Sequence, residues 1–477
     1  MKKKPLFLSI GLWHTKQNTS QTQRSEPQYH PVIKLFLLAI ITFSVANLHA
    51  QTPLLDAYVQ TGLDNNLGLK QQDFVLQKNL IALQEAKTLF RPSVNFNTTY
   101  STAQGGRAIS IPVGDLMNPV YSTLNLLTQT KAFPQIENVN EQLVPKNFYD
   151  TRFKTQMPLL NAEIRFNQSI KQAQVGLQQT EIQLFKRELT KDIKVAYFNY
   201  LKAAEAVRIY DNALVLLRES ERVNKSLIDN GSANPTVLLR TRNEIARIQS
   251  EQEATKQTQQ NAEAYFNFLL NRELTTDIQQ DTSFVVRTAS PSLIAEGKRE
   301  ELDKLQTAIN INQLVLKLNQ SYKQPKIGAI LDLGSQGKLS DINSKNFFAL
   351  FGLSFDLPVY QGGRNLLKIK QTETDIQTLD AQMEQVKRQL ELQETMAQNS
   401  YKAAQQIYKS KQGQVETAER YHRDIFRRYK EGQANFIELL DAQTQITTAQ
   451  LQQSLALYDV WVRWAELERA KAAYPLK

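Results

Sequence analysis

The residue types that support most enzyme chemistry are scarce in this sequence of 477 residues. Cysteine is absent, which excludes disulfides, thiolate metal sites and thiol nucleophiles. Three of the four histidines lie in the first fifty residues, and the fourth, His422, lies in a charged helical segment that favours a surface position. The segment 334–337 contains two glycines but is too short for a nucleotide-binding fingerprint. We therefore expect no enzyme activity, no cofactor and no metal site.

Polar and mostly charged side chains alternate with other residues in 148–157. This pattern indicates a membrane strand rather than a catalytic site. Asp150, Arg152, Lys154 and Gln156 occupy every second position of the segment. A strand face with these groups must line water, because each charge costs about 2 to 4 kcal/mol at the midplane of a membrane. The opposite face carries aromatic, aliphatic and hydroxyl side chains. The segment is therefore predicted to be a strand that separates lipid from water.

Three further segments alternate in the same way, namely residues 93–101, 326–334 and 347–357. In the last segment, one face is a row of six apolar side chains: Phe347, Ala349, Phe351, Leu353, Phe355 and Leu357. A sheet of four strands has two open edges, and unpaired backbone groups in lipid cost several kcal/mol each. Closure of the sheet therefore requires further copies of the chain, and two, three or four copies would supply 8, 12 or 16 strands.

Long helices are predicted for most of the remaining chain, because the sequence contains only 17 Gly and 15 Pro residues. Residues 54–91 show two helical patterns separated near residues 65–66. A helical region then extends from Pro158 to Asn230, and a return helix from Thr236 to Leu270. The first of these long helices has small or apolar residues at the heptad spacing of coiled coils: Val175, Ile182, Leu189, Ala196 and Ala203. Residues 102–147 are rich in Gly and Pro and are predicted to be irregular.

The order of strands and helices occurs twice in the sequence. Pro158 corresponds to Pro358 and Gly231 to Gly432, at offsets of 200 and 201 residues. The heptad residues recur at the second offset: Ile376, Met383, Leu390, Ala397 and Ala404. The chain is therefore predicted to contain an internal repeat.

Residues 1–50 differ from the rest of the chain. Lys34 precedes an apolar run at residues 35–45, which predicts a signal peptide that is cut after Ala50. The run is too short to span a bilayer, which needs roughly 20 apolar residues. Residues 1–33 are polar, and either a start codon assigned too early or a real extension accounts for them.

The predicted domain organisation is an N-terminal extension with a signal peptide at 1–50, a first repeat at 51–301 and a second at 302–477. Without residues 1–50, the chain has 51 basic and 46 acidic residues, a net charge of +5. It has no basic patch with interleaved aromatic residues, so nucleic acid is not expected as a partner.

These features together resemble the TolC-type outer-membrane efflux protein family. The turns and helix starts that carry the resemblance are Leu357-Pro-Val-Tyr-Gln-Gly-Gly-Arg364 with Pro358, Gly362 and Gly363, then Met157-Pro-Leu-Leu-Asn161, Tyr429-Lys-Glu-Gly-Gln-Ala-Asn435, Leu439-Leu-Asp-Ala442 and Phe268-Leu-Leu-Asn-Arg-Glu-Leu274. The resemblance implies a mostly α-helical chain whose four strands contribute to a trimeric, 12-stranded outer-membrane barrel above a periplasmic tunnel. It also implies a homotrimer that docks to a periplasmic adaptor and an inner-membrane pump and conducts substrates passively. The alternative is a periplasmic coiled-coil adaptor or structural protein, which would lack membrane strands.

The resemblance further implies an acidic ring near the periplasmic mouth of the tunnel, at the positions of Glu438 and Asp441. Their spacing of three places both carboxylates on one face of a helix, and threefold symmetry would bring six together. The alternative is that both residues stabilise the dipole of their own helix by about 0.3 to 1 kcal/mol.

A gate is the other feature that the resemblance implies. Tyr429 matches a gate residue, and Gly231 and Gly432 match the turns on either side. The partner positions differ from the family, because Ala434 stands where an arginine is expected and Val237 stands where an acid is expected. Arg240, which corresponds to Asp441 in the first repeat, is the candidate local substitute.

Overall fold

The computed structural model describes residues 53–475, except residues 145, 282–283 and 285–298. These residues belong to one compact unit, Pro53–Lys477. The extension and signal peptide predicted for residues 1–50 lie outside the described residues.

Two short helices open the described chain, as predicted, and Asn66 separates them. Helix α2 spans Pro53–Asn65 and α3 spans Leu67–Thr88. The Asn66 side chain caps α3 by accepting from the backbone N–H of Leu69 at 3.1 Å. Its amide group also donates to the carbonyl oxygen of Leu269 at 2.9 Å. The break between the helices is therefore held against the end of a distant helix.

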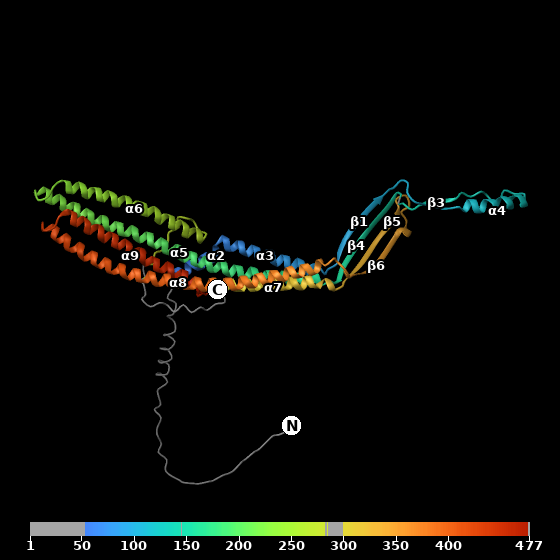
Figure 1. The fold of residues 1–477 in the computed structure, drawn as a ribbon. Helices are drawn as coiled ribbons and strands as arrows, with labels where there is room; N and C mark the ends of the chain where they lie inside the picture. Colours follow the sequence, from blue (N-terminus) through green and yellow to red (C-terminus); the bar gives the residue numbers. More distant parts are fainter. Residues whose placement is uncertain (1–52, 145, 282–283, 285–298, 476–477) are drawn as a thin grey trace, which may run out of the picture. The chain divides into compact units, whose positions relative to one another are not determined.

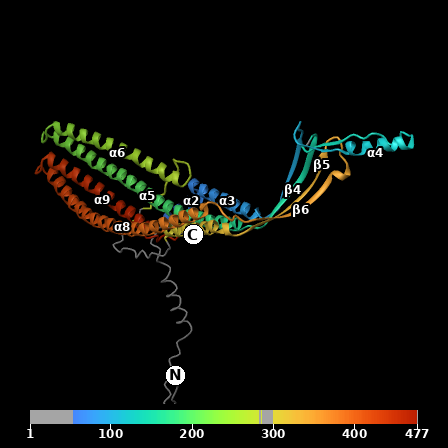
Figure 2. The ribbon, with the colours of Figure 1, turned by 45° about the vertical axis from the view of Figure 1, so that its right-hand side comes forward.

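The remaining long helices form two antiparallel hairpins and a shorter connecting helix: α5 (Ala162–Asp229) with α6 (Thr236–Leu269), α7 (Glu300–Gln320), and α8 (Arg364–Lys430) with α9 (Phe436–Ala470). Helix α5 is continuous over 68 residues, about 100 Å at 1.5 Å per residue. It packs against α3 and α6 and also against α7 and α9, whereas α8 packs against α7 and α9 (Figure 1). Figure 2 shows the same lateral order of the hairpins from a second direction.

The predicted heptad residues lie in these helix contacts. All five in α5 are buried, and in α8 Leu390 and Ala404 are buried while the other three are half-buried. Helix α8 is less covered because it has fewer neighbours within its own chain. Its apolar residues Leu392, Met396 and Ile407 are more than half exposed.

The largest apolar core lies where α2, α5, α6 and α9 meet. Its centre is a group of aromatic rings that includes Tyr197, Phe198 and Phe266, all fully buried. Phe198 and Phe284 pack edge to face with ring centroids 5.2 Å apart. Such pairs contribute about 0.5 to 1.5 kcal/mol each beyond the burial of their area. This core therefore ties the first hairpin to the last helix.

The four predicted strands form one antiparallel sheet in the order β1 (Ser93–Ser101), β4 (Phe148–Leu160), β5 (Lys326–Lys338) and β6 (Phe347–Asp356). The register aligns Phe96, Phe153, Leu333 and Ala349 in one row across the sheet. Because side chains alternate along each strand, all the predicted apolar faces lie on the same side. The faces predicted from the sequence are thus confirmed, and β1 and β6 are the two edges.

The role predicted for Pro158 is wrong, because this residue does not open the long helix. Strand β4 continues through Pro158 to Leu160, and α5 begins at Ala162 with the Asn161 side chain as its cap. Strand β1 begins opposite Gln156, so β4 has no β1 partner beyond that residue, and the register with β5 shifts just after Pro158. Proline is tolerated here because the strand has lost one neighbour and is already irregular.

The prediction that residues 102–147 are irregular is also wrong. They contain an antiparallel ribbon, β2 (Ala108–Ile111) with β3 (Val139–Gln142), and a helix, α4 (Val113–Thr128). Pro112 immediately precedes the helix and Gly105 precedes the ribbon, so several of the breakers lie between elements. We call residues 102–147 the arm. It leaves the sheet at the end opposite the long helices (Figure 1).

Candidate functional site

The two hairpin turns have the same backbone geometry, as their sequence correspondence predicts. Gly231 and Gly432 adopt φ angles of 71° and 74°, in the left-handed region that favours glycine. The next N–H in each turn donates to the carbonyl oxygen five residues back, Ser232 to Leu227 at 2.7 Å and Gln433 to Arg428 at 2.8 Å. Both long helices therefore end in the same glycine-based cap.

Tyr429, the predicted gate residue, is buried and connects the two hairpins. Its hydroxyl group donates to the Asn224 side-chain oxygen on α5 at 2.5 Å. The amide group of Asn224 donates in turn to the Thr241 hydroxyl on α6 at 2.7 Å. Asn224 and Thr241 are completely buried, and burial raises the pKa of Tyr429. The phenol therefore stays protonated at neutral pH and acts as a donor.

The substituted partner positions lie in an apolar cluster around this hydrogen-bond chain. Ala434 and Val237 pack with Tyr429 and with the buried residues Phe436 and Leu439. Arg240, the candidate substitute for the missing charges, lies outside this cluster. It is exposed on α6 and makes no ion pair within the part of the chain that the structure describes.

A second set of contacts joins the hairpins close to Tyr429. The Gln443 side chain on α9 donates to the Ser220 hydroxyl on α5 at 2.6 Å. Lys430 on α8 lies 3.7 Å from the Glu219 carboxylate on α5. Sequence reasoning missed Asn224, Thr241, Ser220 and Gln443, because small polar residues within long helices carry no pattern that identifies their partners.

Glu438 and Asp441 lie on the same side of α9, about a quarter of a turn from the buried residues Leu439 and Ala442. Glu438 takes part in a capping box with Asn435. The Glu438 backbone N–H donates to the Asn435 side-chain oxygen, and the Asn435 amide donates to the Glu438 carboxylate, both at 3.0 Å. Asp441 is exposed and accepts a hydrogen bond from Gln445 at 2.7 Å. The Glu438 carboxylate thus caps its own helix, and the Asp441 carboxylate faces solvent.

His422 lies on α8 one turn before Phe426, and the prediction of a surface position is wrong. The imidazole is buried and stacks on Phe426 with ring centroids 5.9 Å apart. Burial and the charge of Arg423 lower the pKa of His422. A charged helix can therefore still bury a histidine where another helix covers it.

The charged face of the sheet contains an ion-pair cluster. Arg152 bonds to Asp150 on its own strand and to Asp332 on β5, the latter at 3.2 Å. The Arg152 guanidinium also lies 5.4 Å from the ring centre of Phe348 on β6. Asp150 and Arg152, both predicted to line water, thus pair with each other and with Asp332 across two neighbouring strands.

The glycines of the second strand-to-helix turn are arranged as predicted. Gly362 and Gly363 follow Pro358 and have φ angles of 59° and 76°, and Gly363 directly precedes α8.

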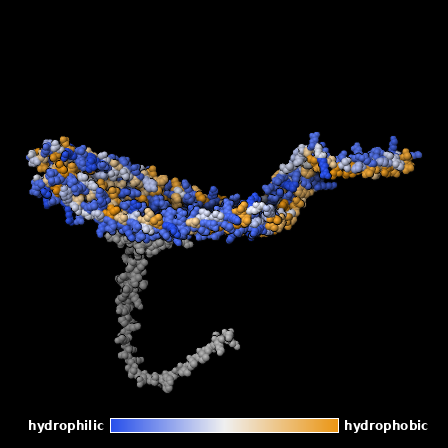
Figure 3. Space-filling view, viewed as in Figure 1, coloured by the Kyte–Doolittle hydropathy of each residue, from blue (hydrophilic) through white to orange (hydrophobic). Residues whose placement is uncertain are grey.

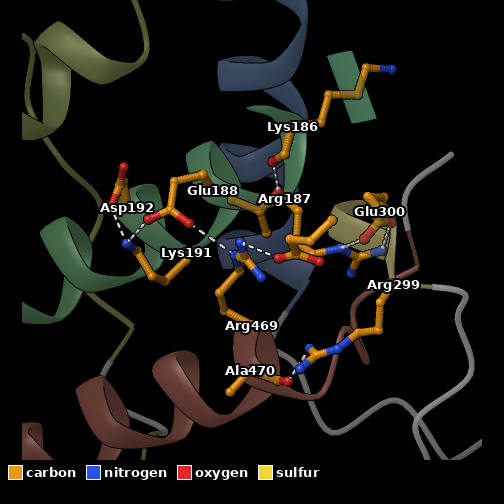
Figure 4. A network of polar contacts seen from close by, with 11 residues as sticks. Lys186, Arg187, Glu188, Lys191, Asp192, Arg299, Glu300, Arg469 and Ala470 are labelled. Carbon is orange, nitrogen blue, oxygen red and sulfur yellow. Dashed lines mark hydrogen bonds and ion pairs between the residues drawn. The ribbon is translucent and has the colours of Figure 1, made fainter. Parts of the chain in front are cut away.

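An ionic network that the sequence did not reveal joins α5, α7 and α9 (Figure 4). Arg469 lies 2.9 Å from both Glu188 and Glu301. Arg187 pairs with Glu300, and Arg299 donates to the carbonyl oxygen of Ala470: these contacts link all three helices.

A fully buried ion pair lies beside this network. The Lys194 ammonium is 2.6 Å from the Glu468 carboxylate and 4.1 Å from the ring centre of Tyr474. Burial lowers the pKa of Lys194, and the charge of Glu468 opposes this effect. The pair is separated by 274 residues in the sequence, so no local pattern could have identified it.

Among residues 53–475, apart from the gaps given above, no group of His, Cys, Asp and Glu side chains could hold a metal ion. In the same residues, no helix has both the length and the apolar character needed to cross a bilayer.

The fold and the paired hairpins are similar to those of solved outer-membrane channels. OprN, described as an outer-membrane channel, superposes with a TM-score of 0.70 at 17% identity, covering 89% of this chain and 91% of OprN. The Campylobacter jejuni CmeC outer-membrane channel gives 0.69 at 13% identity, covering 88% and 86%. The open state of the Neisseria gonorrhoeae MtrE outer-membrane channel gives 0.69 at 15% identity, covering 88% and 89%.

The family model named outer membrane efflux protein matches residues 294–472, the second repeat. The resemblance predicted from the sequence is therefore confirmed, as is the mostly helical fold with a few strands. The family and the similar structures are channels rather than enzymes. No curated protein sequence matches the chain.

Proposed function

We propose that three copies of this chain form an outer-membrane channel, and that their helices continue it as a periplasmic tunnel. An inner-membrane pump and a periplasmic adaptor deliver substrates, which leave passively. The observation that carries this proposal is the two-sided sheet. One face is an exposed apolar surface that includes Phe347, Phe351 and Phe355, and the other holds the Arg152 ion-pair cluster. Such a sheet suits a boundary between outer-membrane lipid and a water-filled pore.

Trimer formation is supported by surfaces that one chain leaves without partners. Strands β1 and β6 are open edges, and pairing β1 with β6 of the next copy closes a barrel of three times four strands. Helices α3 and α8 expose apolar residues in their parts nearest the sheet, for example Phe74 and Ile81 on α3 and Leu367 on α8. Packing α3 of one copy against α8 of the next would cover these residues.

We assign closure of the entrance to Tyr429, Asn224 and Thr241. The resemblance implies charged partners for the gate tyrosine. In this chain the partners of Tyr429 are neutral and buried, and they form a chain of hydrogen bonds through Asn224 to Thr241. Opening the hairpin tips would expose these groups and break the bond between α8 and α5.

The acidic ring is a separate proposal that rests on Asp441 and Glu438. Asp441 is exposed, and only one Glu438 oxygen is engaged by Asn435, so both carboxylates can add negative potential at the entrance. Threefold symmetry would place six of them around one opening and favour cations.

The remaining parts of the proposal concern processing and partners. Residues 1–50 supply the extension and signal peptide, and the two repeats span 51–301 and 302–477. A pocket of about 160 Å³ between α5, α6 and α9, lined by Leu217, Ile248 and other residues, is large enough to take a side chain of the adaptor. Nucleic acid is not a partner in this proposal.

Two adjacent substitutions on β6 test the membrane assignment. Phe351→Lys should prevent insertion, because one lysine per chain costs about 2 to 4 kcal/mol in lipid, or about 6 to 12 kcal/mol per trimer. Leu350→Lys is the matched control, because Leu350 lies on the opposite face, where it pairs with Asp332. The assay is the amount of trimer extracted from outer membranes, measured by light scattering in mild detergent.

Equal yields of the two variants would refute the assignment of the faces. A wild-type chain found as a soluble periplasmic protein would instead support the alternative of a coiled-coil adaptor or structural protein.

A further inference from the structure

The arm turns the polar side of helix α4 inward, toward its own chain. The Asn118 side chain accepts from the N–H of Ile136 and donates to its carbonyl oxygen, both at 2.9 Å. Asn125 makes the same pair of bonds with Phe133, at 3.0 and 2.7 Å. These side chains imitate a strand pairing and fix α4 to the return segment.

The outward side of α4 is apolar. Leu116 is 68% exposed, Val120 49% and Leu127 74%. A helix on the surface of a soluble domain normally has the opposite arrangement, with its polar side outward. Figure 3 shows hydrophobic residues gathered along one side of this part of the chain. Such a patch marks a surface that another molecule covers.

The spacing of apolar residues in α4 indicates that a helix covers it. Val113, Met117, Val120, Leu124 and Leu127 follow one another at intervals of 4, 3, 4 and 3 residues. This is the spacing of a coiled-coil seam, in which identical helices pack side by side.

The charges of the arm favour identical helices over a lipid surface. Helix α4 contains no basic residue, and its one acid, Asp115, accepts a hydrogen bond from Asn138. Helices that lie on membranes usually carry Lys or Arg on their polar side. The whole arm is neutral, with three basic and three acidic residues, so copies do not repel one another: Arg107, Lys131 and Lys146, and Asp115, Glu137 and Glu141.

We propose that the three α4 helices pack together along this seam and form a cap above the outer mouth of the channel. The proposal rests on the trimer proposed above. A barrel of twelve strands, spaced about 4.8 Å apart and tilted about 40°, has a radius of about 12 Å. Its three arms then start about 20 Å apart, and helices pack at about 8 to 10 Å.

The segment that joins the sheet to the arm allows the α4 helices to approach from about 20 Å to about 8 to 10 Å, the distance at which helices pack. Residues 102–106 join the sheet to the ribbon without regular structure, and Gly105 and Gly106 have φ angles of 79° and 101°. The arms can therefore lean toward the threefold axis. Solutes that leave the tunnel must then pass between the arms, so the cap limits the width of the exit.

The absence of cysteine in the chain allows a direct test by single-cysteine cross-linking in purified trimers. Leu127→Cys places a thiol on the seam, and mild oxidation should give a covalent dimer that reductant reverses. Ser122→Cys is the matched control, because Ser122 is exposed on the opposite side of α4 from the seam. It should stay monomeric on a denaturing gel. Adding Val120→Glu to Leu127→Cys should abolish the dimer, because three carboxylates would meet in the seam.

The possible outcomes separate this proposal from the channel proposal. If light scattering shows a trimer but Leu127→Cys gives no covalent dimer, the cap proposal is overturned and the channel proposal stands. The same holds if Ser122→Cys cross-links as strongly as Leu127→Cys. A label on Leu127→Cys that is quenched by lipid-borne quenchers in vesicles would assign the seam to lipid and also overturn the cap. A chain that is monomeric by light scattering overturns the channel proposal itself.

Discussion

Removal of one hydroxyl group should loosen the entrance. In Tyr429→Phe, the buried side-chain oxygen of Asn224 loses its donor, while the Asn224 amide keeps its bond to Thr241. A buried acceptor left without a partner costs about 1 to 3 kcal/mol. If this bond exists only in the closed state, the ratio of open to closed entrances should rise by about 5- to 140-fold per protomer.

Single-channel recordings in planar bilayers provide the assay. Wild-type channels should stay mostly in a low-conductance state, and Tyr429→Phe channels should spend much more time open. Tyr421→Phe is the matched control, because Tyr421 lies two turns earlier on α8, is partly buried in the same cluster, and makes no hydroxyl hydrogen bond among the described residues.

A double variant sharpens the test. Replacing both partners, as in Tyr429→Phe with Asn224→Leu, removes the unpaired acceptor along with the bond, so its effect should differ from the sum of the two single effects. Identical conductance of Tyr429→Phe and wild type would refute the reasoning, and so would an equal effect of Tyr421→Phe.

The other predictions concern charge at the entrance, pH dependence and the buried ion pair. Changing Glu438 and Asp441 together to Gln and Asn should reduce cation selectivity in reversal-potential measurements, and unchanged potentials would leave these residues as helix stabilisers only. Because the pKa of His422 is lowered in the folded chain, its contribution to stability is fully present above pH 6.5 and falls as the pH drops toward the folded pKa. The melting temperature of His422→Phe should therefore fall less than that of wild type between pH 7.5 and 5, and parallel losses would exclude His422 as the cause. Lys194→Met should remove the ammonium group that faces the buried Glu468 carboxylate and cost about 3 to 5 kcal/mol of unfolding free energy, and an unchanged denaturant midpoint would contradict this.

Most of the fold could be predicted because its elements differ sharply in side-chain period. The alternation in residues 347–357 and the sevenfold spacing from Val175 to Ala203 each arise from one buried or lipid-facing side, and each is visible in a single segment. Element ends were less certain, since Pro158 marks a change of environment within β4 rather than the end of the strand.

The arm and the entrance contacts could not be predicted because they depend on pairs of residues far apart. Asn118 and Asn125 look like helix-breaking polar residues until their partners in the return segment are known. Tyr429 was identified by resemblance, but its partner Asn224 is 205 residues away and differs from the family pattern.

The two hairpins are attached to the sheet in different ways. Asn161 alone separates β4 from α5, so the first hairpin is fused to the membrane sheet without a loop that could absorb motion. Residues 357–363 separate β6 from α8 and include the left-handed Gly362 and Gly363. In the channel proposed above, the first hairpin would therefore keep a fixed direction relative to the sheet, whereas the second could change its angle to the sheet at residues 357–363.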